Sequence, residues 1–129
     1  MNKLLLILVC LLIYSPSHSK WEEVLTSGEG DVTHIGIDRI KVKGENVFYW
    51  ELHNISKPKD MFNTKSVMNY IQGHCDEFKY KLLEDVRCVE PMGEGGCVKN
   101  SIPNELKQWS YPIPNSIRDI TLNKVCKLR

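Results

Sequence analysis

The segment NVFYWELHNI, residues 46–55, is the clearest β-strand in this 129-residue chain. It is dominated by aromatic and β-branched residues, which favour a pleated, half-buried surface. Because side chains alternate between the two faces of a strand, three large residues lie on each face. They are Phe48, Trp50 and Leu52 on one face, and Tyr49, Glu51 and His53 on the other. The strand therefore predicts a sheet with two different faces.

The segments on either side of this strand also predict β-structure. Before it, residues 21–27 and 32–37 form a hairpin around a glycine-containing turn, and residues 43–46 reverse the chain again. After it, residues 65–75 form another strand. From residue 78 the even positions then make an apolar face that only Glu84 interrupts. These positions are Phe78, Tyr80, Leu82, Val86 and Cys88. One apolar and one polar face per strand is typical of an antiparallel sheet.

The C-terminal part changes from strand to helix periodicity. Residues 91–108 contain three glycines and two prolines and predict a long loop, with at most one irregular strand near Cys97. Residues 116–128 place apolar side chains at helical spacing, and Asn115 or Ser116 can act as the N-cap. A final strand is the alternative, because Ile, Thr and Val are indifferent helix formers. We therefore predict an α+β fold, an antiparallel sheet with a C-terminal helix.

The N-terminus has the pattern of a cleavable secretory signal. Lys3 precedes an apolar run of 11 residues, 4–14, and the polar segment SPSHS, residues 15–19, follows it. A membrane-spanning helix needs about 20 apolar residues, so an uncleaved anchor is the weaker alternative. We predict a signal peptide over residues 1–19 and one domain over residues 20–129, with cleavage after Ser17 as the second choice. Cys10 follows Val9 inside the apolar run, so lipidation there is not expected.

The charge of the mature domain excludes some classes of partner. The chain has 17 Lys and Arg, one of which is Lys3 in the signal, and 16 Asp and Glu. The mature domain is therefore neutral, and it has no run of five like charges. This pattern argues against nucleic acid or anionic lipid as the partner. After cleavage, no transmembrane span is expected.

Four cysteines remain after the signal is removed, and an even number in an exported domain predicts disulfides. Three pairings are open on the sequence alone. Their spacings of 13, 9 and 29 residues, without a C-x-x-C, fit no common zinc site, so no metal is predicted. The four residues are Cys75, Cys88, Cys97 and Cys126.

No catalytic constellation is visible, so the chain is not expected to be an enzyme. It has no G-x-S-x-G motif, and a cysteine in a disulfide provides no thiolate for nucleophilic catalysis. A metal or haem site would require the sheet to bring three histidines together, and no cofactor is predicted otherwise. These histidines are His34, His53 and His74.

Recognition of a partner is the more natural use of the strand faces. The strip formed by Tyr49, Glu51 and His53 combines aromatic and polar groups, as recognition surfaces do, and it is the candidate binding surface. The three tryptophans, Trp21, Trp50 and Trp109, are expected in the core. An edge strand can also pair with another chain, which would give a homodimer or capture a peptide.

Several short motifs occur in an order that resembles the surface-adhesin protein E family of Gram-negative bacteria. The resemblance covers almost the whole mature domain. Its motifs are Trp21, GDV-x-x-I at residues 30–35, YWEL at 49–52, KPK at 57–59, HC at 74–75, MG-x-G at 92–95, and W-x-x-P-x-P at 109–114.

The resemblance implies a curved antiparallel sheet of about six strands, with a C-terminal helix on its concave side. It also implies a disulfide between Cys75 and Cys126, which leaves Cys88 and Cys97 as a second pair. The expected function is a non-enzymatic, adhesin-like module that binds a host matrix or envelope protein. Because the signal lacks a lipobox, the periplasm or the medium is favoured over the outer cell surface. A periplasmic accessory protein and a small-ligand or haem binder are the alternatives.

Overall fold

The computed structural model describes residues 20–129, and the expected signal peptide with Cys10 lies outside these described residues. The described chain forms one antiparallel sheet, one α-helix and three short 3-10 turns, so the predicted α+β fold is confirmed. The strands are β1 (Trp21–Thr26), β2 (Val32–Gly36), β3 (Lys41–Lys43), β4 (Asn46–Asn54), β5 (Ser66–His74), β6 (Lys79–Cys88) and β7 (Cys97–Ser101). The helix is α2 (Ile117–Leu128), and the turns are η1 (Ile37–Arg39), η2 (Pro91–Gly93) and η3 (Asn104–Leu106).

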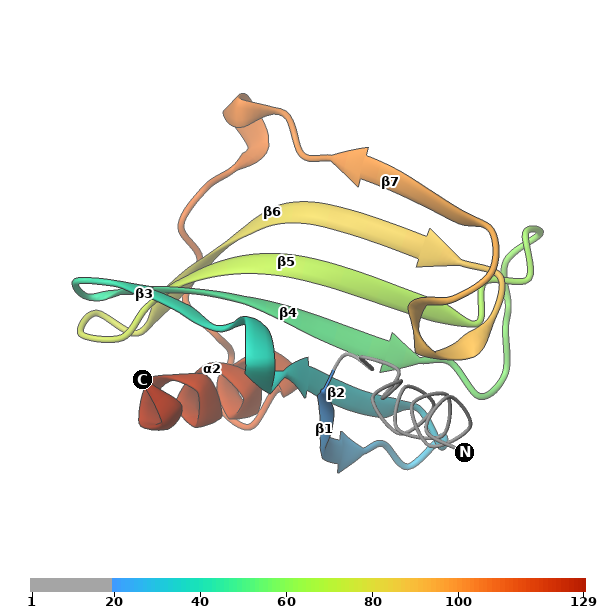
Figure 1. The fold of residues 1–129 in the computed structure, drawn as a ribbon, viewed down its shortest axis with the longest axis horizontal. Helices are drawn as coiled ribbons and strands as arrows, with labels where there is room; N and C mark the ends of the chain where they lie inside the picture. The colour runs from blue at the N-terminus through green and yellow to red at the C-terminus, as the bar shows by residue number, and fades with distance from the viewer. Residues whose placement is uncertain (1–19) are drawn as a thin grey trace, which may run out of the picture.

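The sheet has the strand order β1-β2-β4-β5-β6-β7, and the short β3 also pairs with β4. β2 pairs with the C-terminal half of β4 and β3 with its beginning, so these two strands share one edge of β4. Figure 1 shows β7 at the top edge of the sheet and α2 at the other side, beside the end where β3 ends and β4 begins. The helix therefore covers only part of one face of the sheet.

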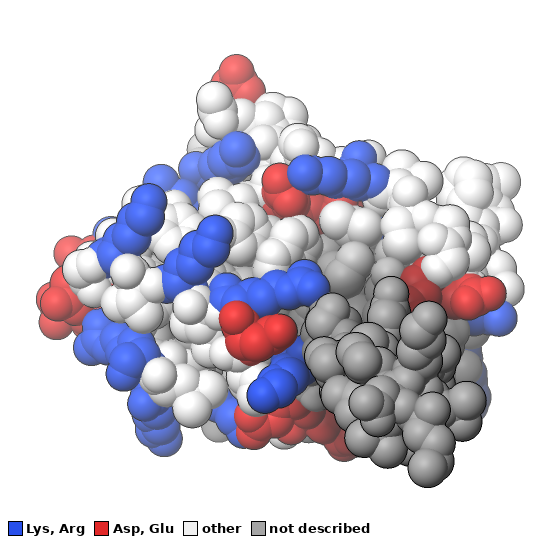
Figure 2. Space-filling model, in the orientation of Figure 1, with Lys and Arg blue, Asp and Glu red and all other residues white. Residues whose placement is uncertain are grey.

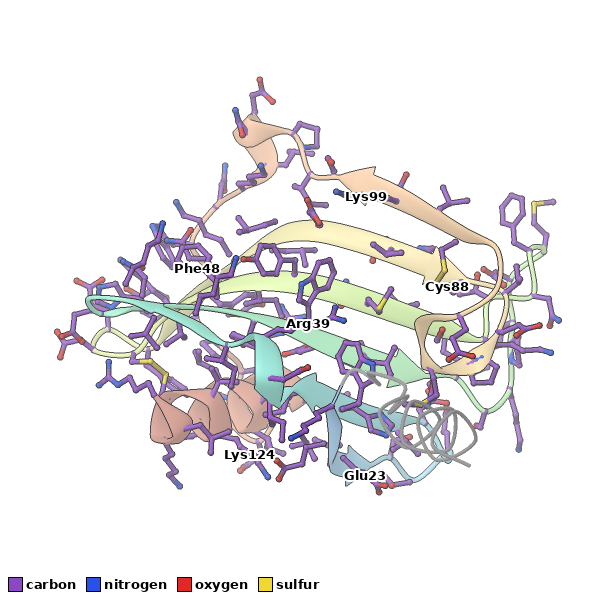
Figure 3. All side chains as sticks on the ribbon, in the orientation of Figure 1. Glu23, Arg39, Phe48, Cys88, Lys99 and Lys124 are labelled. Atoms are coloured by element: carbon purple, nitrogen blue, oxygen red, sulfur yellow. A yellow bond between two sulfur atoms is a disulfide. The ribbon has the colours of Figure 1, made fainter. Side chains whose placement is uncertain are left out.

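The pairing register divides the sheet into two faces. On the first, here called the helix face, Val47 and Tyr49 of β4 lie against Leu122 and Val125 of α2 in a fully buried core. Ile35 and Ile71 complete this core. On the other, here called the aromatic face, Phe48 and Trp50 of β4 lie beside Tyr70 of β5. Phe48 of this face is labelled in Figure 3.

The prediction of one continuous apolar face along residues 78–88 is wrong. The β5–β6 register shifts between Tyr70 and Ile71, which are opposite Glu84 and Leu82, so Leu83 is an extra residue. A β-bulge of this kind moves the following side chains to the other side of the sheet. Leu82 thus packs towards the core, and Glu84 faces the aromatic side. The interruption at Glu84 marks this bulge.

The C-terminal helix begins as its capping residues predict. Ser116 is the N-cap, and its hydroxyl accepts a hydrogen bond from the backbone N–H of Asp119 at 3.3 Å, while the carboxylate of Asp119 accepts one from the N–H of Asn115 at 2.8 Å. Gly73 lets the helix approach the sheet, because a Cβ there would lie 2.5 Å from Cδ1 of Leu122. The helix, and not the alternative final strand, is confirmed.

The two disulfides lie at opposite ends of the sheet (Figure 3). Cys75, just after β5, is bonded to Cys126 in the last turn of α2, across a sequence separation of 51. Cys88 is bonded to Cys97 across the β6–β7 pair, with a Cα–Cα distance of 4.2 Å. The first bond is the one that the family resemblance implied, and the second joins the two cysteines that this pairing left over. Among the described residues, no helix has the length and apolarity that a bilayer crossing requires.

Candidate binding surface

The predicted binding strip of Tyr49, Glu51 and His53 lies on the helix face and not at the surface. Tyr49 and Glu51 are fully buried under α2, and only 20% of the His53 side chain is exposed. The prediction of an accessible strip is therefore wrong. Alternation shows that these residues share a face, but it does not show which face a distant helix covers.

Glu51 instead forms a buried ionic clamp between the sheet and the helix. The hydroxyl of Thr121 donates a hydrogen bond to its Oε1, and Nε of Arg118 lies 3.2 Å from the same oxygen, as an ion pair without hydrogen-bond alignment. Nε2 of His53 lies 3.1 Å from Oε2. A buried carboxylate is tolerated only with such compensation. Burial also raises the pKa of the neighbouring Tyr49 hydroxyl well above its usual range.

Thr33, His53 and Glu51 are arranged in the order of the nucleophile, base and acid of a catalytic triad. Nδ1 of His53 lies 3.0 Å from the hydroxyl of Thr33, and the other ring nitrogen contacts Glu51. Thr33, however, is only 2% exposed, so a substrate would have to displace the packed sheet to reach it. The arrangement therefore serves as a buried hydrogen-bond network within the packed sheet.

The aromatic face carries half-buried rings that contact one another. Trp50 stacks on Tyr70 with a centroid distance of 4.8 Å, and Phe48 lies 6.4 Å from Tyr70 on its other side. The ring of Trp21 lies over Gly36, next to Trp50. Desolvation, with a smaller contribution from Glu84, raises the pKa of Tyr70. None of the tryptophans is fully buried, so the prediction that all three are core residues is wrong.

Lysines surround the end of this face near β3 and the β5–β6 turn. Nζ of Lys43 lies 6.0 Å from the ring centre of Phe48, and Lys79 and Lys81 lie 4.8 and 4.4 Å from that of Trp109. Figure 2 shows basic side chains gathered over this end, at the left of the view. Within residues 20–129, Lys79 pairs with Glu77, whereas Lys43 and Lys81 have no acidic partner. Cation–π contacts of this kind leave most of each lysine charge available.

The sequence alone did not identify this group of lysines, Lys43, Lys79 and Lys81, as part of the candidate site. Lys79 and Lys81 are two residues apart on one strand, which places them on the same face. Trp109 reaches them because Tyr80 and Ser110 form an isolated β-bridge that brings the C-terminal loop back to β6. The alternation of lysines in β6 was a usable signal, but the bridge to Trp109 was not.

The three histidines considered as ligands do not form one site. His34 and His74 both lie on the aromatic face, but at different ends of it, and His53 lies on the helix face. In the described part of the chain, no three His, Cys, Asp or Glu side chains are grouped as metal ligands. Burial lowers the pKa of His34, and the carboxylate of Glu23 opposes this effect.

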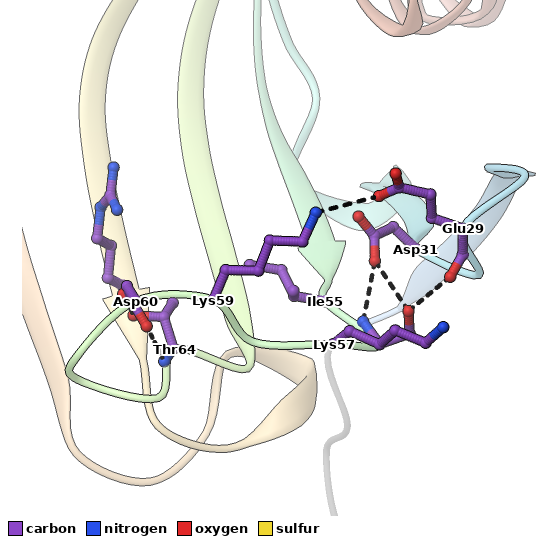
Figure 4. Close-up of a pocket in the computed structure, with 9 residues that line it drawn as sticks. Glu29, Asp31, Ile55, Lys57, Lys59, Asp60 and Thr64 are labelled. Carbon is purple, nitrogen blue, oxygen red and sulfur yellow. Dashed lines mark hydrogen bonds and ion pairs between the residues drawn. The ribbon is translucent and has the colours of Figure 1, made fainter.

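A separate hollow of about 250 Å³ lies between the β1–β2 turn and the β4–β5 loop (Figure 4). Its carboxylates are used to hold these two loops together. Asp31 accepts hydrogen bonds from the N–H and hydroxyl of Ser56, at 2.9 and 3.2 Å, and Lys59 lies 3.8 Å from Glu29. Hydrogen bonds from Thr64 lower the pKa of Asp60. With its three carboxylates already paired, this hollow is a loop contact and a weaker candidate than the aromatic face.

The comparisons with known proteins agree with this fold. Two solved structures of Haemophilus influenzae protein E are similar to the chain. Crystal form II has a TM-score of 0.63 at 15% identity, over 86% of this chain and 90% of that one. The protein from a non-typeable strain has a TM-score of 0.55 at 14% identity, over 88% and 76%. At such identities the likeness shows the fold alone.

The sequence comparisons are more specific about the family. Among curated proteins, no sequence matches the chain. The family model described as surface-adhesin protein E, however, matches residues 21–127, which is nearly the whole described domain. The chain therefore belongs to the surface-adhesin protein E family.

Proposed function

We propose that this chain is a non-enzymatic, exported, adhesin-like protein that binds a protein partner through its aromatic face and the adjoining lysines. The observation that carries the proposal is the stacked pair of Trp50 and Tyr70, half-buried on the face opposite α2. Large aromatic side chains supply most of the binding free energy in protein interfaces. Family membership supports an adhesive role.

The lysines indicate the kind of protein that this surface favours. Lys43, Lys79 and Lys81 place positive charge at one end of the aromatic face, and only Lys79 is paired. Charges at the rim of an interface steer association and select a partner of opposite sign. An acidic patch beside apolar groups on the partner would therefore match this surface best.

The domain boundaries are part of the same proposal. We place the start of the mature protein at Lys20, after removal of the signal, and its site of action in the periplasm or the medium. Intact-mass measurement of protein from its native envelope tests the boundary. A mass that begins at Lys20, without lipid, supports it, whereas acyl chains on Cys10 would contradict it and place the protein on a membrane.

Binding is tested by interferometry with oxidised protein of residues 20–129 and an immobilised panel of extracellular-matrix and serum proteins. We expect at least one member to bind, with an affinity that falls as salt is raised. Lys81→Glu and Phe48→Ser should each weaken that binding at least tenfold. Lys127→Glu, which makes the same charge change at the exposed end of α2, should leave it unchanged.

Two results would overturn the proposal. If no member of the panel binds, the adhesin-like role fails, and a periplasmic accessory role becomes the better explanation. If Lys81→Glu and Lys127→Glu weaken binding equally, the aromatic face is not the binding surface. Circular dichroism of each variant, with a spectrum and melting curve like those of the unaltered protein, shows that the loss comes from the surface and not from unfolding.

A further inference from the structure

A second surface, separate from the aromatic face, lies at the outer edge of β7. Within the described residues, β7 pairs only with β6, and no strand lies beyond it in Figure 1. All five of its residues are exposed. A free strand edge presents backbone donors and acceptors in a row, and another extended chain can pair with them.

The ladder between β6 and β7 determines which backbone groups face outwards. The N–H of Val89 donates to the carbonyl of Gly96 at 3.1 Å, and bonded pairs in an antiparallel ladder alternate with non-bonded ones. Val98 and Asn100 therefore bond to β6. The close Cα–Cα distance of 4.2 Å across the disulfide fits a non-bonded pair. The outward N–H and C=O groups are those of Cys97, Lys99 and Ser101.

An apolar hollow of about 290 Å³ lies beside this edge, on the side of the sheet to which Val98 points. Phe62 and Val98 line it and are 74% and 65% exposed, and Val89 contributes to its wall. Met61, next to Phe62 in the chain, is also largely exposed. Neighbouring exposed apolar side chains of this size are typical of a contact surface.

We propose that the β7 edge and this hollow receive an extended segment of a partner protein, which adds to the sheet as a further strand. Its backbone pairs with Cys97, Lys99 and Ser101. Side chains alternate across the added strand, so a residue opposite Lys99 is flanked by residues directed towards the side of Val98. The matching segment has an acidic residue opposite Lys99 and apolar residues on either side of it.

Charge argues against a second copy of this chain as the occupant. Two β7 strands that pair around a two-fold axis with the longest overlap place Lys99 opposite Lys99 of the other copy. Like charges directly opposite each other destabilise a strand pair. Nζ of Lys99 already lies 3.0 Å from Oε1 of Glu84 in its own chain. In such a dimer each of the two facing lysines would therefore have one carboxylate as its ion-pair partner. An acidic residue on a partner strand removes this conflict.

Hydrogen exchange on the oxidised protein of residues 20–129 tests this directly. The probe is the capped peptide Glu-Val-Thr-Val-Glu-Val-Thr-Val-Glu, and a peptide of the same composition without alternation is its control. We expect the alternating peptide to slow exchange of the outward amides of Cys97, Lys99 and Ser101 at least tenfold. The amides of Val98 and Asn100, which already bond to β6, should change little.

Variants separate this site from the aromatic face. Lys99→Pro removes an outward N–H without touching the β6 ladder, and proline is tolerated at a sheet edge. This variant and Phe62→Ser should abolish the protection, whereas Lys81→Glu should retain it. Unchanged exchange with the alternating peptide, or equal protection by its control, would overturn the proposal. Outward amides that become protected without peptide, as protein concentration rises, would overturn it in favour of a second copy.

Discussion

The two faces of β4 carry aromatic and polar side chains of similar size, but their surroundings differ. On the helix face, Tyr49 and Glu51 are fully buried under α2. On the aromatic face, Phe48 and Trp50 remain half-buried and contact other rings instead of a second layer. One strand thus supplies both the core of the domain and its candidate binding surface.

This difference suits the two faces of the sheet to different roles, one to stability and the other to binding. The helix face holds the disulfide to Cys126, the buried charge of Glu51 and the close approach at Gly73. These features bear on stability, because each requires the helix to be in place. The rings of Phe48, Trp50 and Tyr70 on the aromatic face contact none of these three features, so substitutions of these rings should change binding more than stability.

The largest effect on this comparison should come from the disulfide that holds α2 on the helix face. Replacing Cys75 and Cys126 together by serine releases a loop closed across 51 residues, which lowers the unfolding free energy by about 4 kcal/mol. Replacing Cys88 and Cys97 releases a loop of 9 and should cost about 2.5 kcal/mol. Denaturant titration measures both losses of unfolding free energy. A larger loss for the Cys88 and Cys97 variant would contradict the claim that the disulfide to α2 stabilises the domain more.

The next largest effect should come from the buried carboxylate. Glu51→Gln leaves Arg118 without its charged partner in the interior, and breaking a buried pair in this way costs about 3 kcal/mol. The matched control on the aromatic face is Glu84→Gln, whose partner Lys99 is largely exposed. The control should change stability by less than about 1 kcal/mol. If the two variants lose similar amounts of unfolding free energy, the buried ion pair of Glu51 contributes no more to stability than an exposed one.

A smaller effect should follow from filling the space at which helix and sheet approach. In Gly73→Ala the new methyl group meets Leu122 at 2.5 Å and Val47 at 3.0 Å, and both are fully buried, so overpacking should cost about 2 kcal/mol. Gly28→Ala is the control, because nothing lies within 4 Å of its Cβ position. Thermal melting should show a lower midpoint temperature for Gly73→Ala and an unchanged midpoint temperature for Gly28→Ala.

The smallest effect concerns pH and belongs to the aromatic face. Burial lowers the pKa of His34 below its value of 6.5 in the unfolded chain, so the unfolded state binds the proton more readily. Its contribution to stability is present above pH 6.5 and is lost as the pH falls through the folded pKa. His34→Gln should flatten the fall in unfolding free energy between pH 7 and pH 5. An unchanged slope in that variant would assign the fall to other groups.

Much of the fold could be predicted because its signals are local. The strand at residues 46–54, the hairpin before it and the Ser116 cap depend on neighbours in the chain. The candidate site could not be predicted in the same way. The expected strip of Tyr49, Glu51 and His53 depended on which face stays open, and that was assigned wrongly.

The exported character, the α+β class and the cysteine framework follow from composition, periodicity and family resemblance, without knowledge of any contact. The position of α2, the bulge at Leu83 and the contact of Trp109 with Lys79 and Lys81 required the folded chain. The physical reason is that alternation sorts residues into two sets but does not say which set will be buried. That choice depends on the free energy of packing against a helix some 70 residues away along the chain, as in the hydrogen bond between Thr121 and Glu51.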